Sequence, residues 1–371
     1  MAQPWPESDP ALLAPVEEHD QLRSIVRQVL AKHAGHEQVR TAADSALGWS
    51  ADLWSRLNGE LEIGGLAVPE GLGGAGFGVR EVAVVLEEAG ASLLPEPVLA
   101  SAVLGCRALA AADDPEGVAG LRADALSGAS VLTVSLGTGL DAVCHGSSWL
   151  LTGSVAGVLH AESSNHVVVV ARTDAGPGLF LVACEHCSIT PRQVVDLTRR
   201  QADVTLDSAP AVLLVAAPRG EVVLADLRRL ALVALAAEHA GIVARLLDLT
   251  CEYVVQREQF GRAIGSFQAV KHRLADVLVD RERALSAARY AAALLDSDAD
   301  QDEADLAAAI AAAVCQDAAL RTAHETVQLH GGIGFTWEHQ AHYYLRRVLG
   351  DEGLFGSSRE HRAAIATLVG V

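Results

Sequence analysis

The stretch whose residue types could most directly do chemistry runs from Arg257 to His272 and reads REQFGRAIGSFQAVKH. Gly261 and Gly265 predict a bend between two apolar-rich helical runs. Arg257 precedes this bend and Gln268 opens the following helix. An arginine beside a helix N-terminus suits a pyrophosphate, because unpaired backbone N–H groups and a fixed cation face the same anion. The pattern also fits an exposed helix-loop-helix with a surface arginine, and spacing alone leaves both interpretations open.

Two further strings accompany it: QLHGGIGFT at residues 328–336 and GLAVPEGLGGAG at residues 65–76. The stretch at 257–272 and the string at 328–336 resemble, in order and spacing, the two segments of the C-terminal domain of acyl-CoA dehydrogenases that contact FAD. The string at 65–76 resembles the N-terminal loop of the same family. The resemblance spans nearly the whole chain and is thinnest in the middle. It implies FAD as the cofactor, with these contact residues: Arg257, Phe260, Ile264, Gln268, Gln328, Leu329, His330, Gly331 and Gly332.

Composition excludes several classes of partner. The 371 residues carry a formal net charge of -19, so no basic stripe is available for nucleic acid or an anionic membrane. Met1 to Pro15 shows no secretory signal, and we expect no membrane-spanning run. Six scattered cysteines suit a reducing compartment. We therefore expect a soluble, cytoplasmic protein.

Two short clusters have side chains that metals use, and we expect no metal site at either. Cys184 and Cys187 lack a second pair of ligands. His339 and His342, which follow Glu338, would need ligands from elsewhere in the chain.

Periodicity predicts a helix-β-helix order, which is also the architecture of the family. Apolar residues recur at three and four before residue 112, short Val-rich runs follow between 131 and 216, and long helical runs fill the remainder. Gly71 to Gly76 satisfies GxGxxG, but Pro69 interrupts any strand before it, so we expect a loop. The predicted fold is α+β, with an N-terminal helical domain (1–128), a small middle β-barrel domain (129–219) and a C-terminal four-helix bundle (220–371).

The reaction implied by the resemblance removes the α proton of an acyl-CoA thioester with a carboxylate base while the β hydrogen leaves as hydride to the flavin. At the position where most members carry the glutamate base, this chain has Phe355. At the alternative position used by a minority, it has Ala231. We therefore expect no catalytic residue, with Glu238 and Glu352 as the remaining candidates.

The middle region also departs from the family. Residues 134–141, VSLGTGLD, stand where members carry a threonine-glutamate-proline turn followed by glycine-serine-aspartate. Gly157 to His160 stands where a tryptophan-isoleucine-threonine-asparagine string packs on the flavin ring. In the family, the middle domain holds the flavin ring of its own subunit and the C-terminal segments hold the cofactor of a neighbour. The resemblance therefore implies that an aromatic wall and a hydroxyl donor are lost for the chain's own flavin, whereas the segments for a neighbour's flavin are kept.

This pattern resembles the degenerate subunit of heterotetrameric acyl-CoA dehydrogenases, similar to those with which actinobacteria desaturate steroid side chains. It implies a non-catalytic subunit that completes the FAD site of a second, dehydrogenase-like subunit, with an acyl-CoA substrate and an electron-transfer acceptor. Two alternatives stay open: a self-sufficient homotetramer with an atypical base, and a flavin-free scaffold or acyl-CoA binder.

Overall fold

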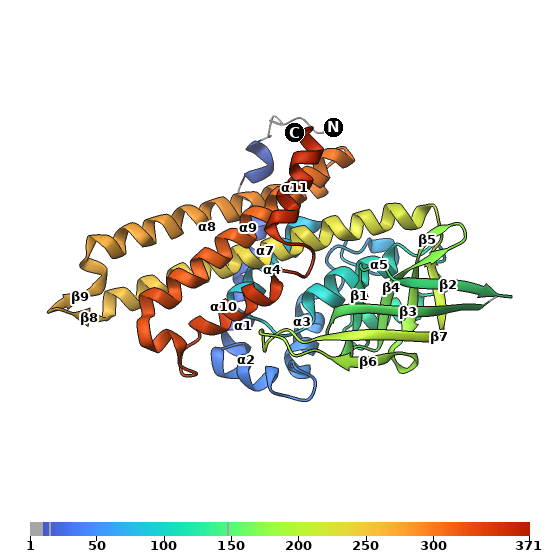
Figure 1. Ribbon diagram of the computed structural model, residues 1–371, viewed down its shortest axis with the longest axis horizontal. Helices are drawn as coiled ribbons and strands as arrows, with labels where there is room; N and C mark the ends of the chain where they lie inside the picture. Colours follow the sequence, from blue (N-terminus) through green and yellow to red (C-terminus); the bar gives the residue numbers. More distant parts are fainter. Residues whose placement is uncertain (1–9, 15, 147) are drawn as a thin grey trace.

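The computed structural model describes residues 10–14, 16–146 and 148–371. Most of the segment on which the expected absence of a secretory signal rests, residues 1–9 and 15, lies outside the described residues. Figure 1 shows an elongated molecule, with a small sheet at the right and long helices that extend to the left. Helices precede and follow the sheet along the chain, which confirms the predicted fold class.

The N-terminal region is helical because its apolar residues recur on one helix face. In α3, Leu53, Trp54 and Leu57 are buried, and the Ser50 hydroxyl caps the helix by accepting from the Leu53 N–H. The GxGxxG string forms a short 3-10 turn and a loop, as predicted. The elements are η1 (Pro10–Leu13), α1 (Glu17–His33), α2 (His36–Ala43), α3 (Ala51–Leu61), η2 (Glu70–Leu72), α4 (Val79–Ala91), the π-helix η3 (Val98–Gly105), α5 (Cys106–Ala110) and α6 (Ala119–Leu126).

The middle region is a seven-stranded sheet that closes on itself. Strands β4, β5, β7, β3 and β2 pair in turn, and a single pair, Asp141 with Arg172, joins β2 back to β4. An ion pair of 2.7 Å between the same two side chains supports this closure. The strands are β1 (Leu132–Ser135), β2 (Leu140–His145), β3 (Ser148–Leu159), β4 (His166–Thr173), β5 (Gly176–Ala183), β6 (Ser188–Pro191) and β7 (Gln201–Val215).

The C-terminal region packs long helices against one another and against α4. After α9 (Gln301–His330) and the turn that follows it, the Thr336 hydroxyl donates to the Ile333 carbonyl oxygen and closes a 3-10 turn, so the next helix begins only at Ala341. The elements are α7 (Arg219–Gln256), β8 (Glu258–Gln259), β9 (Arg262–Ala263), η6 (Ile264–Ser266), α8 (Gln268–Leu295), α9 (Gln301–His330), η7 (Gly331–Phe335), α10 (Ala341–Asp351) and α11 (Ser358–Val369). The domain boundaries at 128/129 and 219/220 stay predictions.

Two glycines set the close crossing of α4 and α7. A Cβ on Gly241 would lie 1.8 Å from the Glu87 carbonyl oxygen, and a Cβ on Gly90 would lie 2.1 Å from the Glu238 carbonyl oxygen. Neither distance is compatible with a side chain. The two helix backbones are therefore in direct contact at this point.

Helices α7 and α9 are long and apolar enough to cross a membrane by length and composition, which corrects the expectation that no such run exists. Their apolar windows are 83% and 72% buried inside the fold. The core helix of a soluble protein meets the same criteria, so these helices are weak evidence for a membrane span.

Candidate functional site

The C-terminal ends of α7 and α9 meet at the end of the bundle that lies farthest from the sheet (Figure 1). The Tyr253 ring stacks on the His330 ring with centroids 4.3 Å apart, and the Tyr253 hydroxyl donates to the His330 carbonyl oxygen at 3.2 Å. These contacts bring the two strings expected to contact FAD to one region of the molecule. We call this region, residues 257–272 and 328–336, the bundle end.

Arg257 and Phe260 project from the short hairpin that follows α7. Arg257 ends this helix, is exposed, and has no ion-pair partner among the described residues. Phe260 is 92% exposed and has a φ of 55°, a left-handed conformation that is unusual for a bulky residue. Ile264 is half-buried and donates its N–H to the Arg257 carbonyl oxygen at 2.8 Å. A free cation and an exposed ring thus stand out from the fold.

Gln268 is the first residue of α8, and no side chain caps this helix. The residue before it, Phe267, has an extended conformation, and its carbonyl oxygen accepts from the N–H groups of Val270 and Lys271. The backbone N–H groups at the start of a long helix favour an anion, as does the nearby Arg257. The hairpin and the helix start therefore fit the pyrophosphate of a dinucleotide.

The second string ends α9 and continues into η7. Gln328 is exposed and Leu329 half-buried, whereas His330 is 3% exposed. Gly331 and Gly332 are exposed, and a Cβ on either would meet open space. Gly331 also has a φ of 61°, which favours glycine.

His330 has a fixed tautomer. Its Nδ1 lies 2.7 Å from the Thr326 carbonyl oxygen, which can only accept, so Nδ1 carries the proton. Nε2 is then an acceptor, and it is buried with no partner among the described residues. Burial lowers the pKa of this histidine. An unpartnered buried acceptor beside two open glycines fits a ligand that presents a hydroxyl or amino group.

Three further histidines extend this region, and sequence reasoning did not connect them with it. The His339 ring lies 4.5 Å from the His330 ring, and the rings of His36 and His342 lie 5.1 and 4.4 Å from that of Tyr343. Burial lowers the pKa of His339 to about 4 and also lowers those of His36 and His342. His339 and His342 were considered only as metal ligands, because the turn that folds His339 back onto His330 leaves no periodic signal.

A cavity of about 370 Å³ lies at the other end of the bundle, against the sheet. The ends of β1 and β3, residues 134–137 and 156–159, form one side, and α7 forms another. Leu354 and Phe355 also line it. The segments that depart from the family in sequence therefore meet here, although residues 138–141 and His160 lie outside the lining. No described residue that lines this cavity carries a carboxylate.

Glu238, one of the two candidate bases, lies in a buried ion-pair cluster that joins the three regions of the chain. Its Oε1 accepts from Arg347 Nη1 at 2.5 Å and also from Arg199 Nη2. Arg199 further donates to Asp351 at 2.6 Å, and Arg347 to Asp196 at 2.6 Å. Two guanidinium groups occupy this carboxylate oxygen, and Glu238 does not line the cavity, so the arrangement argues against Glu238 as the base.

The remaining positions are equally unsuited to proton abstraction. Glu352 is exposed at the end of α10, and its backbone carbonyl accepts from Gln316 at 3.1 Å. Ala231 is fully buried in the core. Although burial raises the pKa of Asp351, Arg199 and His239 lower it to about 2, which keeps this carboxylate ionised.

The two regions of one chain are far apart. Arg228, which lines the cavity, and Arg257 at the bundle end lie on the same helix, about 44 Å apart at 1.5 Å per residue. Figure 1 shows the hairpin and the sheet at opposite ends of the molecule. The bundle end and the cavity of a single chain therefore cannot line one compact site.

Comparison with known proteins places this geometry in a family. Residues 16–113 match the family model of the acyl-CoA dehydrogenase N-terminal domain, and residues 227–369 match that of the acyl-CoA dehydrogenase C-terminal domain. The chain belongs to the acyl-CoA dehydrogenase family. The enzymes of this family are oxidoreductases that act on CH–CH bonds, which confirms the predicted enzyme class.

Among acyl-CoA dehydrogenases, the chain is 36% identical to acyl-CoA dehydrogenase IpdE2 of Mycobacterium tuberculosis, over 94% of this chain and 96% of the relative. Two solved structures are 31% identical. The ChsE4-ChsE5 complex from Mycobacterium tuberculosis has a TM-score of 0.89 and covers 96% of this chain and 98% of that chain. The Tcur3481-Tcur3483 steroid ACAD G363A variant has a TM-score of 0.87, with 95% and 98% covered.

FAD is the cofactor of acyl-CoA dehydrogenases, as predicted. A structure with the same fold, PigA with FAD and proline, has a TM-score of 0.87 at 17% identity. In the present chain, the features of the bundle end that suit FAD are Arg257, the uncapped start of α8 and the unpartnered Nε2 of His330. The individual contact residues stay a prediction.

Proposed function

We propose that this chain is a non-catalytic subunit of an FAD-dependent acyl-CoA dehydrogenase, and that its bundle end completes the FAD site of an unlike partner subunit. The observation that carries the proposal is that the two ends of α7 present different kinds of side chains. One end presents groups suited to a dinucleotide, and the other carries Phe355 where a base would be required. A chain with this pair of ends can assist a flavin site without owning one.

At the bundle end, Arg257 and the first N–H groups of α8 would hold the pyrophosphate of the partner's cofactor, since both favour an anion. His330 Nε2 would accept a hydrogen bond from a hydroxyl or amino group of the same molecule. Gly331 and Gly332 leave the backbone open to close approach. When bound, FAD supplies the hydride acceptor of the dehydrogenation.

At the sheet end, the cavity measures about 370 Å³, but none of the described residues that line it carries a carboxylate that could act as the base. Phe355 cannot accept a proton, and Glu238 is held by two arginines away from the lining. A base must therefore come from the partner subunit, whose own site the bundle end would complete. This division gives one FAD for each pair of unlike chains.

Names of related proteins support the finer parts of the proposal. The names of the ChsE4-ChsE5 complex and of the Tcur3481-Tcur3483 structure each contain two components. This supports a second dehydrogenase-like subunit, and hence a heterotetramer, for the present chain. The second of these is a steroid ACAD, which supports a CoA thioester of a steroid side chain as the substrate class. We further propose that the complex works in the cytoplasm and passes its electrons to a separate acceptor.

The test is the flavin absorbance and FAD-to-protein ratio of the chain purified alone and after co-expression with a dehydrogenase-like gene that adjoins its own. We expect a colourless chain alone and one FAD per two unlike chains after co-expression. One FAD per chain alone, with reduction of a dye by an acyl-CoA, would instead indicate a self-sufficient enzyme. A complex that forms but stays colourless would indicate a flavin-free scaffold.

A further inference from the structure

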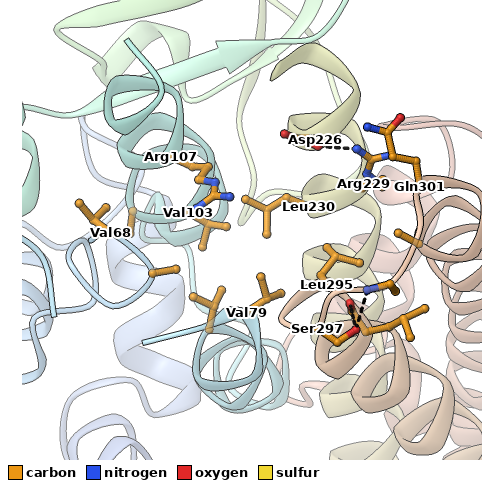
Figure 2. Close-up of a pocket in the computed structure, with 16 residues that line it drawn as sticks. Val68, Val79, Val103, Arg107, Asp226, Arg229, Leu230, Leu295, Ser297 and Gln301 are labelled. Carbon is orange, nitrogen blue, oxygen red and sulfur yellow. Dashed lines mark hydrogen bonds and ion pairs between the residues drawn. The ribbon is translucent and has the colours of Figure 1, made fainter. Parts of the chain in front are cut away.

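A second cavity, of about 230 Å³, lies where the N-terminal helices meet the C-terminal ones (Figure 2). Its apolar wall includes Val79 of α4, Val103 of η3, Leu230 of α7 and Leu295 of α8. The connection between α8 and α9 covers one side, with Gln301 at the rim. Segments that precede the sheet and segments that follow it both contribute to the lining, so this cavity exists only when the two sets of helices are packed together.

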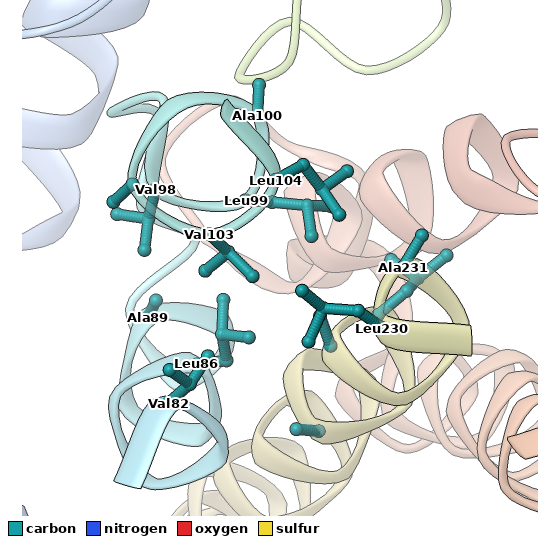
Figure 3. Packing of buried hydrophobic residues seen from close by; sticks show 14 of the residues in the cluster. Val82, Leu86, Ala89, Val98, Leu99, Ala100, Val103, Leu104, Leu230 and Ala231 are labelled. Atoms are coloured by element: carbon teal, nitrogen blue, oxygen red, sulfur yellow. The ribbon is translucent and has the colours of Figure 1, made fainter. Parts of the chain in front are cut away.

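This cavity is separate from the one that contains Phe355. With 3.6 residues per turn, Leu230 lies on a different face of α7 from Arg228 and Leu232, which line the other cavity. Figure 3 shows Leu104 of η3 close to Leu230 and Ala231 in the packed core. Leu104 is 1% exposed and Ala231 is 0% exposed, and none of the described residues lines both cavities.

The charges around the 230 Å³ cavity differ in whether they already have partners. Arg229 pairs with Asp226 and, at 2.9 Å, with Asp305, so two carboxylates compensate its charge. Arg107 lines the cavity and has no ion-pair partner among the described residues. Figure 2 shows its guanidinium beside Val103 at the edge of the space. The rim therefore offers one available cation above an apolar wall.

We propose that this cavity binds a small amphiphilic carboxylate, with the carboxylate on Arg107 and the hydrocarbon against Val79, Val103 and Leu230. A guanidinium forms paired hydrogen bonds with a carboxylate, and the apolar wall favours a saturated chain. An apolar cavity of about 150 Å³ already holds benzene, so 230 Å³ suits a chain of about six to ten carbons. Asp226, which also lines the cavity, disfavours a dianion such as a phosphate monoester.

The ligand would stabilise the packing of the N-terminal helices on α7. A ligand that binds only the folded state raises the unfolding temperature in proportion to the logarithm of its concentration once sites are filled. This site is independent of the proposed role of the bundle end, since no residue is shared.

The experiment is calorimetric titration of the full chain with octanoate, with octanol and octylamine as probes that change only the head group. We expect saturable binding of octanoate, weaker binding of octanol by about tenfold or more, and no binding of octylamine. Octanol that binds as tightly as octanoate would overturn the role of Arg107, and the absence of saturable octanoate binding would overturn the site.

Three variants locate the binding. Arg107→Gln removes an exposed cation and should weaken octanoate about tenfold while leaving octanol unchanged. Ala304→Leu, on the first turn of α9, should fill part of the cavity and weaken both ligands. Arg228→Gln is the matched control on the other face of α7 and should leave octanoate binding unchanged. Equal losses in Arg107→Gln and Arg228→Gln would mean that octanoate responds only to net charge, and would overturn the proposal.

Discussion

The bundle end and the cavity against the sheet belong to the same helix, α7, yet they differ in what their side chains do. At the bundle end, Arg257 has no ion-pair partner in the described part of the chain, and Phe260 is almost fully exposed. At the sheet end, Leu232 and Phe355 face a cavity whose described lining has no carboxylate, and the nearby buried charges are paired with one another. The groups at the first end are available to another molecule, whereas the second end offers no carboxylate for proton abstraction among the described residues of its lining.

The residues that stabilise the fold near the sheet are therefore different from those that line the two candidate sites. The buried cluster around Glu238 and Arg347 holds the sheet, α7 and α10 together without contributing to either candidate site. The sheet end could thus lose its base while its supports remained.

The two ends would no longer differ in chemistry if Glu238 were catalytic. We expect Glu238→Ala to lower the free energy of unfolding by about 3–5 kcal/mol, because it leaves Arg199 and Arg347 with an uncompensated buried charge. Urea unfolding of the purified chain measures this. The exposed Glu352→Ala is the control, with an expected change within about 0.5 kcal/mol.

In the complex with the partner, Glu238→Gln should keep full turnover per bound flavin. A Glu238→Gln complex that is folded and loaded with flavin but inactive would contradict the structural role of Glu238.

The next test concerns the bundle end itself. Arg257→Ala in the complex should weaken FAD retention by about 2 kcal/mol, since it removes a cation from the proposed pyrophosphate site. Flavin fluorescence during dilution or dialysis reports the released cofactor. Arg172→Ala, which removes an exposed arginine of the sheet, is the matched control and should retain FAD. Equal retention in both variants would remove Arg257 from the site.

The bundle end and the buried cluster around Asp351 should also respond to acid in different pH windows. The pKa of His339 falls from 6.5 to about 4 on folding, so the unfolded chain binds more protons between these values. The stability from this histidine is present above pH 6.5 and is lost as the pH falls toward 4. For Asp351, whose pKa falls from 3.8 to about 2, the loss begins only below pH 3.8.

FAD release from the complex should therefore begin below pH 6.5, before the cluster around Asp351 weakens. Positive charge on His339 would face His330, His36 and His342, with Arg346 and Arg40 also nearby. His339→Asn should shift FAD release to lower pH, whereas His324→Asn, an exposed position on α9, should not. Release that begins only below pH 4 would show that the histidines do not control cofactor binding.

The smallest expected effect is at the sheet end. Phe355→Ala enlarges a cavity that has no proposed catalytic role, so turnover of the complex should stay within about twofold, or about 0.4 kcal/mol. Steady-state assay with a dye acceptor measures this. A large loss of turnover with FAD retained would place Phe355 in a working active site and remove the distinction between the two ends.

Much of the fold follows from local patterns. The long helical runs predicted after residue 216 include α7, because a long apolar period is a strong signal. The Val-rich runs expected between 131 and 216 include β4, whereas β2 and β6 are largely exposed and have no such run, so local sequence does not indicate them. Such strands form because they pair with neighbouring strands, and local sequence does not predict these hydrogen bonds.

The site was less predictable, because its arrangement depends on distant partners. The strings at 257–272 and 328–336 were found by resemblance, but only the stacking of Tyr253 on His330 shows that they meet. The role of Glu238 depends on Arg199 and Arg347, which lie 39 and 109 positions away in the sequence. No spacing rule connects such residues. The location of the bundle end opposite the cavity was likewise visible only in three dimensions.

The crossing of α4 and α7 at Gly90 and Gly241 bears on how such a chain arises. Contact between the two backbones admits no side chain at either glycine, so the relative position of the helices does not depend on what fills the cavity near Phe355. After duplication of an ancestral gene, substitutions in that cavity could accumulate without displacing the helices, while a methyl group at either crossing would be eliminated by selection. We would expect paralogues that have lost the base to retain both glycines.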